Sequence, residues 1–384
     1  MKYSIIVPVF NRPDEVDELL ESLSNQTQRD FEVIIVEDGS AKTCKDVCDK
    51  YADILALHYY AKENSGPGQS RNYGAERANG EWLIILDSDV VLPEGYLEAV
   101  DERINNEKLI INNYDYQTNT DSSVDSSTRQ KGMQSNHNSS SLIINSELAA
   151  FGGPDAAHPS FTPVQKAISY SMTSFFTTGG IRGGKAKLDK FYPRSFNMGI
   201  RRDVYLQLGG FSKMRFGEDI DFSYRIVEAG YKTRLFPEAW VWHKRRTDFR
   251  KFFRQVYNSG IARINLTKRH PGTLKLVHLL PTVFTLGVIG LILISAVGRA
   301  LMHYVDRDQF YWMCFAPWIP ILFYSLIICV DSTIRNRSLW VGLLSIPAAF
   351  VQLMGYGLGF IESWWKRCVL KQDEFTAFER TFYN

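Results

Sequence analysis

The stretch Trp82-Leu83-Ile84-Ile85-Leu86-Asp87-Ser88-Asp89-Val90-Val91 decides the fold. Its first five residues are apolar and long enough for a buried strand, and two carboxylates one residue apart follow before apolar residues resume. Burying an ionised carboxylate without a partner is costly, so this pair needs a partner. A hard divalent cation could be this partner, because such cations take oxygen ligands. The position also fits, since open α/β sheets bind ligands beyond the carboxyl ends of their strands. The alternative is a polar turn that closes the strand.

Strand and helix patterns alternate on the N-terminal side of this stretch. Three apolar runs predict strands, at residues 3–10, 31–36 and 54–60. Apolar residues at helical spacing follow the first of them, at Val16, Leu19, Leu20 and Leu23. A further helix containing Arg71 and Ala75 leads to the strand at 82–86. Alternation at this spacing predicts a parallel, doubly wound sheet.

Six motifs in this order resemble those of inverting family 2 glycosyltransferases with the GT-A nucleotide-sugar fold. They lie at residues 4–11, 36–40, 66–72, 86–89, 197–202 with 209–211, and 217–225. The resemblance covers residues 1–105 and 150–260. It implies an α/β fold, with a Rossmann-like mixed sheet and helices on both of its faces. It also implies an enzyme that transfers a sugar from a nucleoside diphosphate.

The resemblance also assigns the donor side of the site. Contacts to the nucleotide sugar are expected from Pro8, Val9, Phe10, Asn11, Asp38, Arg71, Asp87 and Ser88. Asp38 would accept a hydrogen bond from the base, or it is simply a turn residue before Gly39. Arg71 would hold the acids of the pocket or approach the phosphates.

A metal ion, Mg²⁺ or Mn²⁺, is expected on the diphosphate, because a Lewis acid stabilises the leaving group. Asp89 is the preferred direct ligand, and Asp87 binds the ribose or contacts the metal. His243 follows a short apolar strand and is either a further metal ligand, a diphosphate contact or a structural residue. Arg245 and Arg246 are expected to contact phosphate, since guanidinium groups pair with it bidentately.

Inversion at the sugar carbon requires a base that deprotonates the incoming hydroxyl group. By resemblance Asp219 has that role and Glu218 orients it or binds the acceptor, while Asp221 is the weaker candidate. A structural interpretation exists beside this one: the three acids form the first turn of a helix, where the helix dipole favours negative charge. Both interpretations can hold together.

The sequence divides into four regions. Residues 1–243 form the predicted catalytic domain, 244–275 a basic amphipathic segment next to the membrane, 276–365 about three transmembrane helices and 366–384 a tail. Residues 106–149 depart from the family pattern, and the part from 112 to 141 is dominated by Asn, Ser, Thr, Gln and Asp. Such a composition holds too few apolar side chains for a core, so an inserted surface loop is expected.

Three apolar runs, at residues 276–297, 310–330 and 339–361, are each about twenty residues long and can each cross a bilayer. Gln352 leaves a re-entrant or interfacial segment as the alternative for the third.

Residues 244–275 hold ten Lys or Arg against one acid. By the positive-inside rule the protein is a multi-pass protein of the inner (cytoplasmic) membrane, with its catalytic domain in the cytoplasm. Aromatic residues interleave with this charge, which favours a helix on anionic lipid over a nucleic-acid partner: Phe249, Phe252, Phe253 and Tyr257.

Together these features predict the metal-dependent transfer of a sugar to a lipid-linked or membrane-proximal saccharide acceptor in cell-surface glycan biosynthesis. The expected donor is a UDP-sugar, since UDP is the most common carrier. One alternative is a synthase that extends a polysaccharide, although the Gln-x-x-Arg-Trp motif of processive members is absent. Another is a catalytically silent nucleotide-binding membrane component. The five cysteines suggest neither a disulfide framework nor a zinc site.

Overall fold

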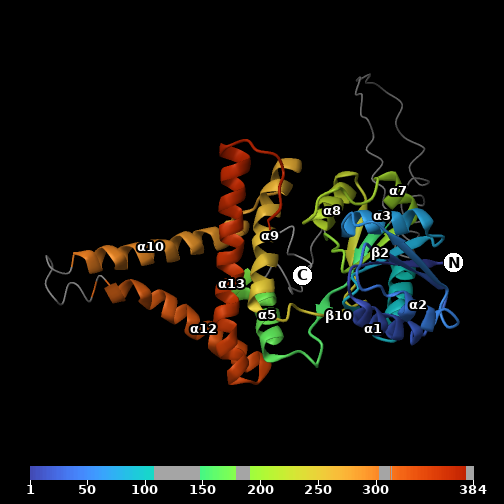
Figure 1. Cartoon of the computed structure of the whole chain (residues 1–384), viewed down its shortest axis with the longest axis horizontal. Coiled ribbons are helices and arrows are strands. Elements are labelled where there is room, and N and C mark those ends of the chain that lie inside the picture. The colour runs from blue at the N-terminus through green and yellow to red at the C-terminus, as the bar shows by residue number, and fades with distance from the viewer. Residues whose placement is uncertain (108–147, 179–190, 302–311, 313, 378–384) are drawn as a thin grey trace, which may run out of the picture. The chain divides into compact units, whose positions relative to one another are not determined.

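The computed structural model describes the chain except residues 108–147, 179–190, 302–311, 313 and 378–384 (Figure 1). The polar insertion expected at 112–141 therefore lies outside the described residues. Contacts within the chain define two units. The first consists of residues 1–156, 188–213 and 218–243, and the second of residues 157–187, 214–217 and 244–384.

A seven-stranded mixed sheet forms the centre of the first unit, in the order β3-β2-β1-β4-β8-β6-β9. Its strands are β1 (Tyr3–Val9), β2 (Phe31–Asp38), β3 (Leu57–Lys62), β4 (Trp82–Leu86), β6 (Leu148–Gly152), β8 (Asn197–Arg201) and β9 (Lys232–Leu235). β1 to β4 pair in parallel, as do β6 and β9, whereas β8 is antiparallel to both of its neighbours. The mixed sheet that the family resemblance implied is confirmed. The parallel pairing predicted from alternation up to residue 86 is confirmed by β1 to β4, and the antiparallel strand β8 lies beyond that part of the sequence.

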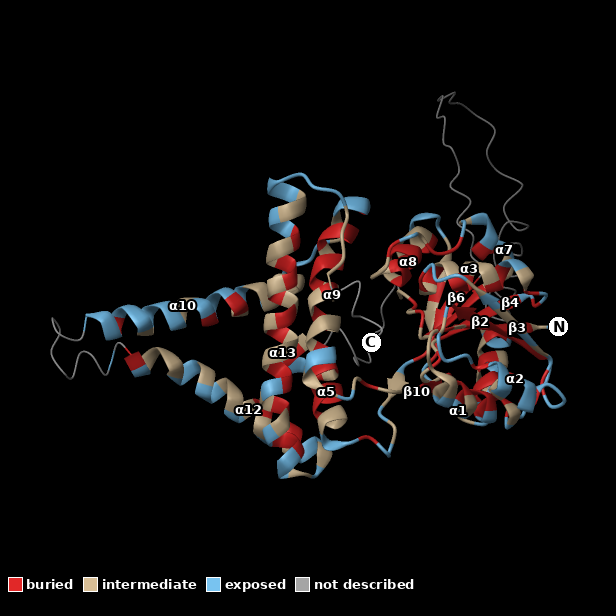
Figure 2. Ribbon diagram, viewed as in Figure 1, coloured by how far each residue is buried: buried red, intermediate tan, exposed pale blue. Residues whose placement is uncertain are grey.

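Both faces of this sheet are covered by helices. Side chains alternate along β1, so that Ile5 and Val7 lie in the core on one face and Ile6 in the core on the other. The first core includes residues from α1 (Pro13–Ser24), α2 (Lys45–Tyr51) and the helix at 96–107. The second includes residues from α3 (Pro67–Arg77), α7 (Arg202–Gln207) and α8 (Glu218–Glu228). Burial on both faces, which colours the strands red in Figure 2, explains the continuous apolar runs in the sequence.

The strand order reverses at β1, with β2 and β3 on one side and β4 on the other. Ligands of open α/β sheets bind at such a switch point, outside the carboxyl ends of the strands. Asn11 follows β1 there with a φ of +54°. Its side-chain oxygen accepts hydrogen bonds from the backbone N–H groups of Ala41 (2.7 Å) and Lys42 (2.9 Å). This asparagine therefore joins the turns that follow β1 and β2.

A smaller three-stranded sheet lies beside this point, in the order β5-β10-β7. Its strands are β5 (Val90–Val91), β7 (Asp155–Ala156) and β10 (Val241–His243). β10 is antiparallel to β5, with His243 opposite Val90, and parallel to β7, with Val241 opposite Asp155. The pairing thus brings His243 next to the residue that follows Asp89.

The second unit is helical. Its elements are α5 (Pro163–Thr173), α6 (Phe175–Thr178), α9 (Phe249–Arg269), η1 (Leu276–His278), α10 (Leu280–Ala300), η2 (Ala316–Trp318), α12 (Ile319–Asn336), α13 (Leu339–Trp364) and η3 (Trp365–Val369). Three helical stretches are long and apolar enough to cross a membrane, at Leu276–Ala300, Ala316–Asn336 and Leu339–Val369. They overlap the three predicted apolar runs, although the second begins at 316 rather than 310 and residues 310, 311 and 313 lie outside the described residues. α13 passes Gln352 without a break.

α9 and α13 approach each other closely through glycines. A Cβ atom on Gly260 would lie 2.1 Å from the carbonyl oxygen of Tyr356, and one on Gly359 would lie 2.0 Å from that of Tyr257. Phe252, on the apolar side of α9, is fully buried in the packing of this unit. The sequence assigned that apolar side to lipid, but protein covers it at Phe252, because the glycines let α13 pack directly against the helix.

All five cysteines are free thiols, as the sequence predicted. Cys44 and Cys48 are buried at the start and in the middle of α2. There the backbone N–H of Cys44 donates to Glu37 Oε2 (2.8 Å).

Candidate active site

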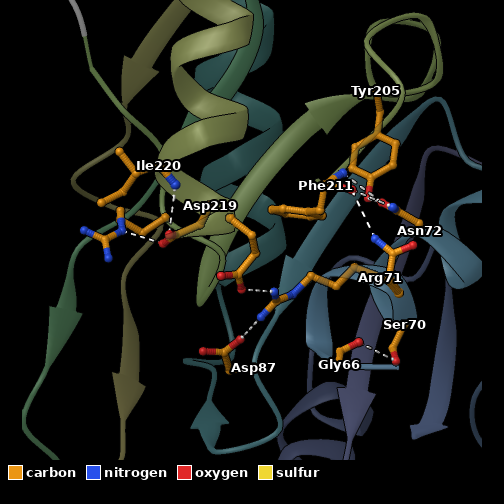
Figure 3. Close-up of polar contacts among 12 residues, drawn as sticks. Gly66, Ser70, Arg71, Asn72, Asp87, Tyr205, Phe211, Asp219 and Ile220 are labelled. Carbon is orange, nitrogen blue, oxygen red and sulfur yellow. Dashed lines mark hydrogen bonds and ion pairs between the residues drawn. The ribbon is translucent and has the colours of Figure 1, made fainter. Parts of the chain in front are cut away.

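One guanidinium group joins the two acidic motifs (Figure 3). Arg71, on α3, donates from Nη2 to Asp87 Oδ1 (2.7 Å) and from Nη1 to Glu218 Oε1 (3.0 Å). Asp87 follows β4, and Glu218 is the first residue of α8. Burial of Arg71 favours its neutral form, but the charges of Asp87 and Glu218 outweigh this and raise the pKa of Arg71. Of the two roles that the sequence left open for Arg71, holding the acids of the pocket is the one observed.

Arg71 is itself positioned by an aromatic ring and an amide. Its Cζ lies 5.2 Å from the ring centroid of Phe211. Asn72, the next residue of α3, donates to the carbonyl of Phe211 (2.8 Å), and its oxygen accepts from the backbone N–H of Phe211 (2.8 Å) and the hydroxyl of Tyr205 (2.6 Å). The glycine before Phe211, Gly210, has a φ of +61°. The amide therefore ties the Gly-Gly-Phe turn to α3 (Figure 3).

Asp219 lies in an ion pair at the start of α8. Arg194 Nε donates to Asp219 Oδ2 at 2.5 Å, and the backbone N–H of Ile220 donates to Oδ1 at 2.8 Å. Burial of Asp219 favours the neutral acid, but the charge and hydrogen bond of Arg194 prevail and lower the pKa of Asp219. The carboxylate is therefore anionic and oriented at neutral pH.

Glu218 differs from its neighbour in protonation. Burial, reinforced by the negative charge of Asp219 and opposed by Arg71, raises the pKa of Glu218 to about 7. Because α8 begins at Glu218, these acids also form the first turn of a helix, as the structural interpretation predicted. Asp221, the weaker candidate for the base, pairs with Arg225 (3.2 Å).

A second group of side chains has the donor set of a metal site. One ligand atom from each of Asp87, Asp89 and His243 lies within 4.8 Å of the other two. His243 Nε2 is 3.3 Å from Asp89 Oδ1, and Arg12 Nη1 is 2.9 Å from Asp89 Oδ2. Two carboxylates and an imidazole offer the oxygen and nitrogen donors that Mn²⁺ accepts, and the carboxylates also suit Mg²⁺. The residues present therefore fit the divalent cation that the sequence predicted.

On the nucleotide side, Asp38 has a structural task. Its carboxylate accepts from the backbone N–H groups of Ser65 and Gly66, both at 2.9 Å, and from the ammonium group of Lys62. It thereby holds the turn between β3 and α3, which is the turn role left open by the sequence. Its contact with a base stays a prediction. The other predicted donor contacts lie at the carboxyl ends of β1 and β4, namely Pro8, Val9, Phe10, Asn11 and Ser88.

Several residues of this region carry no motif and escaped sequence reasoning: Arg12, Asp155, Arg194 and Phe196. Their partners lie far away in the chain, 77 residues for Arg12 with Asp89 and 25 residues for Arg194 with Asp219. Asn72 lies in the motif at 66–72, but sequence reasoning gave it no role. Arg245 and Arg246 belong to the second unit. There the carbonyl of Arg245 accepts a hydrogen bond from Gln165 (3.0 Å), and the predicted phosphate contacts of both arginines stay predictions.

The mixed sheet, with acids at its switch point and a helical membrane region after it, defines the class of GT-A glycosyltransferases. Residues 4–155 match the family model described as glycosyl transferase family 2, and residues 195–328 match glycosyl transferase family group 2. The chain belongs to glycosyltransferase family 2.

Individual relatives agree with this assignment. An uncharacterized glycosyltransferase of Rickettsia bellii is 32% identical over 116 residues, which are 30% of this chain and 17% of the relative. TarS of Staphylococcus aureus, a poly(ribitol-phosphate) beta-N-acetylglucosaminyltransferase, is 38% identical over 93 residues, 23% of this chain and 16% of the relative. The aligned part thus spans less than a fifth of the length of either.

A solved structure shows a similar fold. The mannosyltransferase PcManGT of Pyrobaculum calidifontis, in complex with GDP-Man and Mn²⁺, matches with a TM-score of 0.50 at 13% identity. The match covers 95% of this chain and 88% of that one.

Proposed function

We propose that the protein transfers one sugar from a nucleoside-diphosphate sugar to a lipid-linked or membrane-proximal saccharide acceptor, with inversion, in the biosynthesis of a cell-surface glycan. The observation that carries this proposal is the bridge formed by Arg71. A single guanidinium contacts both Asp87, of the cation group, and Glu218, next to the proposed base. The groups needed on the leaving-group side and on the acceptor side of a transfer are therefore gathered at the carboxyl end of β4.

Asp89, Asp87 and His243 would hold Mn²⁺ or Mg²⁺ on the donor. The cation supplies Lewis-acid stabilisation of the departing diphosphate. The turn from Pro8 to Asn11 and Asp38 would face the nucleoside, since they follow β1 and β2 at the switch point.

Asp219 is the proposed general base. The acceptor hydroxyl oxygen forms the new bond to the anomeric carbon while the bond from that carbon to the diphosphate oxygen breaks. The bonding pair leaves with the nucleoside diphosphate, and the hydroxyl proton passes to the carboxylate of Asp219. Attack from the side opposite the leaving group inverts the anomeric centre. The hydrogen bonds from Arg194 and Ile220 fix the carboxylate, and a positioned base of this kind contributes on the order of 10²–10⁴-fold to the rate.

The membrane-spanning character of three helices supports an acceptor at the membrane. The basic residues between 244 and 275 support an inner-membrane location with the first unit in the cytoplasm, where nucleotide sugars are made. Membrane lipid is then a further partner of the chain.

The test is a panel of UDP-, GDP- and TDP-sugars given to the full chain in detergent or lipid nanodiscs, with Mn²⁺, Mg²⁺ or EDTA. UDP-sugars are the first donors to examine. GDP-mannose belongs in the panel because PcManGT was solved with GDP-Man and Mn²⁺. The acceptors are a polyprenyl phosphate, a polyprenyl-linked saccharide and a soluble oligosaccharide.

We expect one donor to release its nucleotide in the presence of metal and not in EDTA, with the sugar recovered in the lipid fraction. Turnover of the soluble oligosaccharide alone would contradict the membrane acceptor. Repeated addition of sugar to one acceptor would identify a polysaccharide synthase instead. Metal-dependent nucleotide binding without turnover on any acceptor would identify a catalytically silent component.

A further inference from the structure

The three-stranded sheet β5-β10-β7 aligns three side chains across its strands. β5 starts directly after Asp89, β10 ends at His243, and β7 starts at Asp155. The antiparallel pairing of β10 with β5 puts His243 opposite Val90, and its parallel pairing with β7 puts Val241 opposite Asp155. The imidazole of His243 consequently lies between two carboxylates that come from opposite edges of the same small sheet.

The two ring nitrogens of His243 face different acids. Nε2 is 3.3 Å from Asp89 Oδ1, and Nδ1 is 3.8 Å from Asp155 Oδ2. The side chains of all three residues are largely shielded from solvent, with exposures of 17% for His243, 15% for Asp89 and 23% for Asp155. Charges that are shielded in this way interact more strongly than charges at an open surface.

An aromatic ring fixes the plane of the imidazole. Phe196, the residue before β8, stacks on His243 with a centroid separation of 5.0 Å and an interplanar angle of 21°. Stacking leaves the ring edges, and therefore both nitrogens, directed within the plane that holds the acids. Rotation of the ring out of this plane would lose the contact.

Asp89 is the nearer acid and by itself favours a proton on Nε2, but a cation held by Asp89 would remove that preference. The tautomer of the neutral ring is then determined by the carboxylate near Nδ1. This carboxylate stabilises the form with the proton on Nδ1, and that form leaves the lone pair of Nε2 directed at the Asp89 side. A metal ligand needs this lone pair, and a carboxylate behind a ligating histidine both orients the ring and raises its basicity. Asp155 has the position of such a carboxylate.

We propose that Asp155 is a positioning residue that sets the tautomer and direction of His243 for a divalent cation, with Phe196 fixing the plane of the ring. The inference rests on the proposed metal site of Asp87, Asp89 and His243. It adds a residue that contributes no ligand atom to that group and acts only through the histidine.

The experiment is Mn²⁺ binding to the full chain in detergent, measured by the EPR signal of unbound Mn²⁺ at fixed UDP concentration. The variants are Asp155→Ala, Asp155→Asn, His243→Ala and the double variant Asp155→Ala with His243→Ala. Asp203→Asn is the matched control, since Asp203 is likewise an acid in an ion pair, with Arg201, but lies outside this group. The thermal unfolding midpoint of each variant is recorded beside its affinity for Mn²⁺.

We expect Asp155→Ala to weaken Mn²⁺ binding by about 10- to 100-fold, the range found for such supporting residues. Asp155→Asn should recover part of this affinity, because its amide oxygen can still face Nδ1 but carries no charge. In the His243→Ala background the same Asp155→Ala change should have no further effect, because its partner is gone. A merely structural role would instead lower the affinity equally in both backgrounds.

The outcomes separate the two proposals. If the wild-type chain binds Mn²⁺ and Asp155→Ala binds it equally well, the role of Asp155 is wrong and the metal site stands. An equal loss with and without His243 also overturns the role. If the wild-type chain with UDP binds no Mn²⁺ at all, the metal site itself is wrong, and the positioning role falls with it.

Discussion

Arg194 and Asp219 are joined by a hydrogen-bonded ion pair of 2.5 Å between Nε and Oδ2. The positive charge of Arg194 keeps the proposed base ionised. The N–H of Ile220 holds the other carboxylate oxygen, so the orientation of the carboxylate is fixed from both sides. Arg201 and Asp203 form a pair of the same length, but Asp203 is 63% exposed and lies outside the cluster of acids. The chain thus contains an internal comparison for the ion pair of the proposed base.

Asp219→Asn should lower the rate of sugar transfer by about 10²–10⁴-fold, since the amide cannot take the proton of the acceptor. Donor binding should change little, because the proposed metal ligands and nucleoside contacts are intact. The measurement is the turnover rate beside the Kd for the nucleotide. Asp203→Asn serves as the control and should retain full activity. Equal activity of the two variants would reject Asp219 as the base.

Arg71→Met should destabilise the first unit by roughly 3 kcal/mol, because it leaves two carboxylates without the buried guanidinium that joins them. Arg71→Lys should recover only part of this, since an ammonium group cannot fork between two acids. Thermal unfolding of the purified chain measures both effects. Arg77→Met, on the same helix but partly exposed, should shift the midpoint less. A larger shift for Arg77 would contradict the structural role of the bridge.

Glu218 should make the folded protein less stable as pH rises from about 4.5 towards 7. Its pKa is raised to about 7 in the folded chain, against 4.5 for an ordinary glutamate. Between these values the folded state binds more protons than the unfolded state, so stability falls with increasing pH. Glu218→Gln removes this titration. We therefore expect its unfolding midpoint to fall less than that of the wild type between pH 5 and 7, and parallel curves for the two proteins would refute the raised pKa.

Gly359→Ala should disrupt the contact between α9 and α13. The added methyl group would lie 2.0 Å from the carbonyl oxygen of Tyr257, so the helices must move apart, at a cost of about 1–3 kcal/mol. Gly290→Ala in α10 is the matched control, because a Cβ there meets no described atom within 4 Å. It should be neutral or slightly stabilising, since alanine is the better helix former. The readout is the thermal midpoint and the yield of monodisperse protein in detergent.

The sequence predicted those parts of the fold that depend on neighbouring residues. The strand at 82–86, the helix containing Val16 and Leu19, and the three apolar helical stretches each follow from a local pattern. The direction of β8 could not be predicted in this way. It depends on how β8 enters the folded sheet between β4 and β6, which is a property of the tertiary structure.

The residues of the candidate site also divide into those that the sequence predicts and those that it does not. Asp87, Asp89 and Asp219 are recognisable because each stands in a motif. The arginines that pair with these acids are not, since a basic residue gives no sign of its partner when that partner is 77 residues away, as it is for Arg12 and Asp89. Asp38 differs from them: the sequence left a base contact and a turn role open, the folded chain shows the turn role through the backbone N–H groups of Ser65 and Gly66, and the base contact stays a prediction.

The position of β8 between β4 and β6 has a consequence for the order of events during synthesis. Strands β1 to β4 can pair as soon as residue 86 has left the ribosome, and domains generally fold as their N-terminal parts emerge. β6 is complete at residue 152 and, among the described strands, pairs with β8 and β9, so within that part of the chain its first neighbour in the sheet is residues 197–201. The nascent chain therefore carries an unpaired β6 for at least the next 44 residues, from 153 to 196. Asp87 and Asp89 are therefore synthesised well before Asp219, and before His243, which completes the proposed cation group.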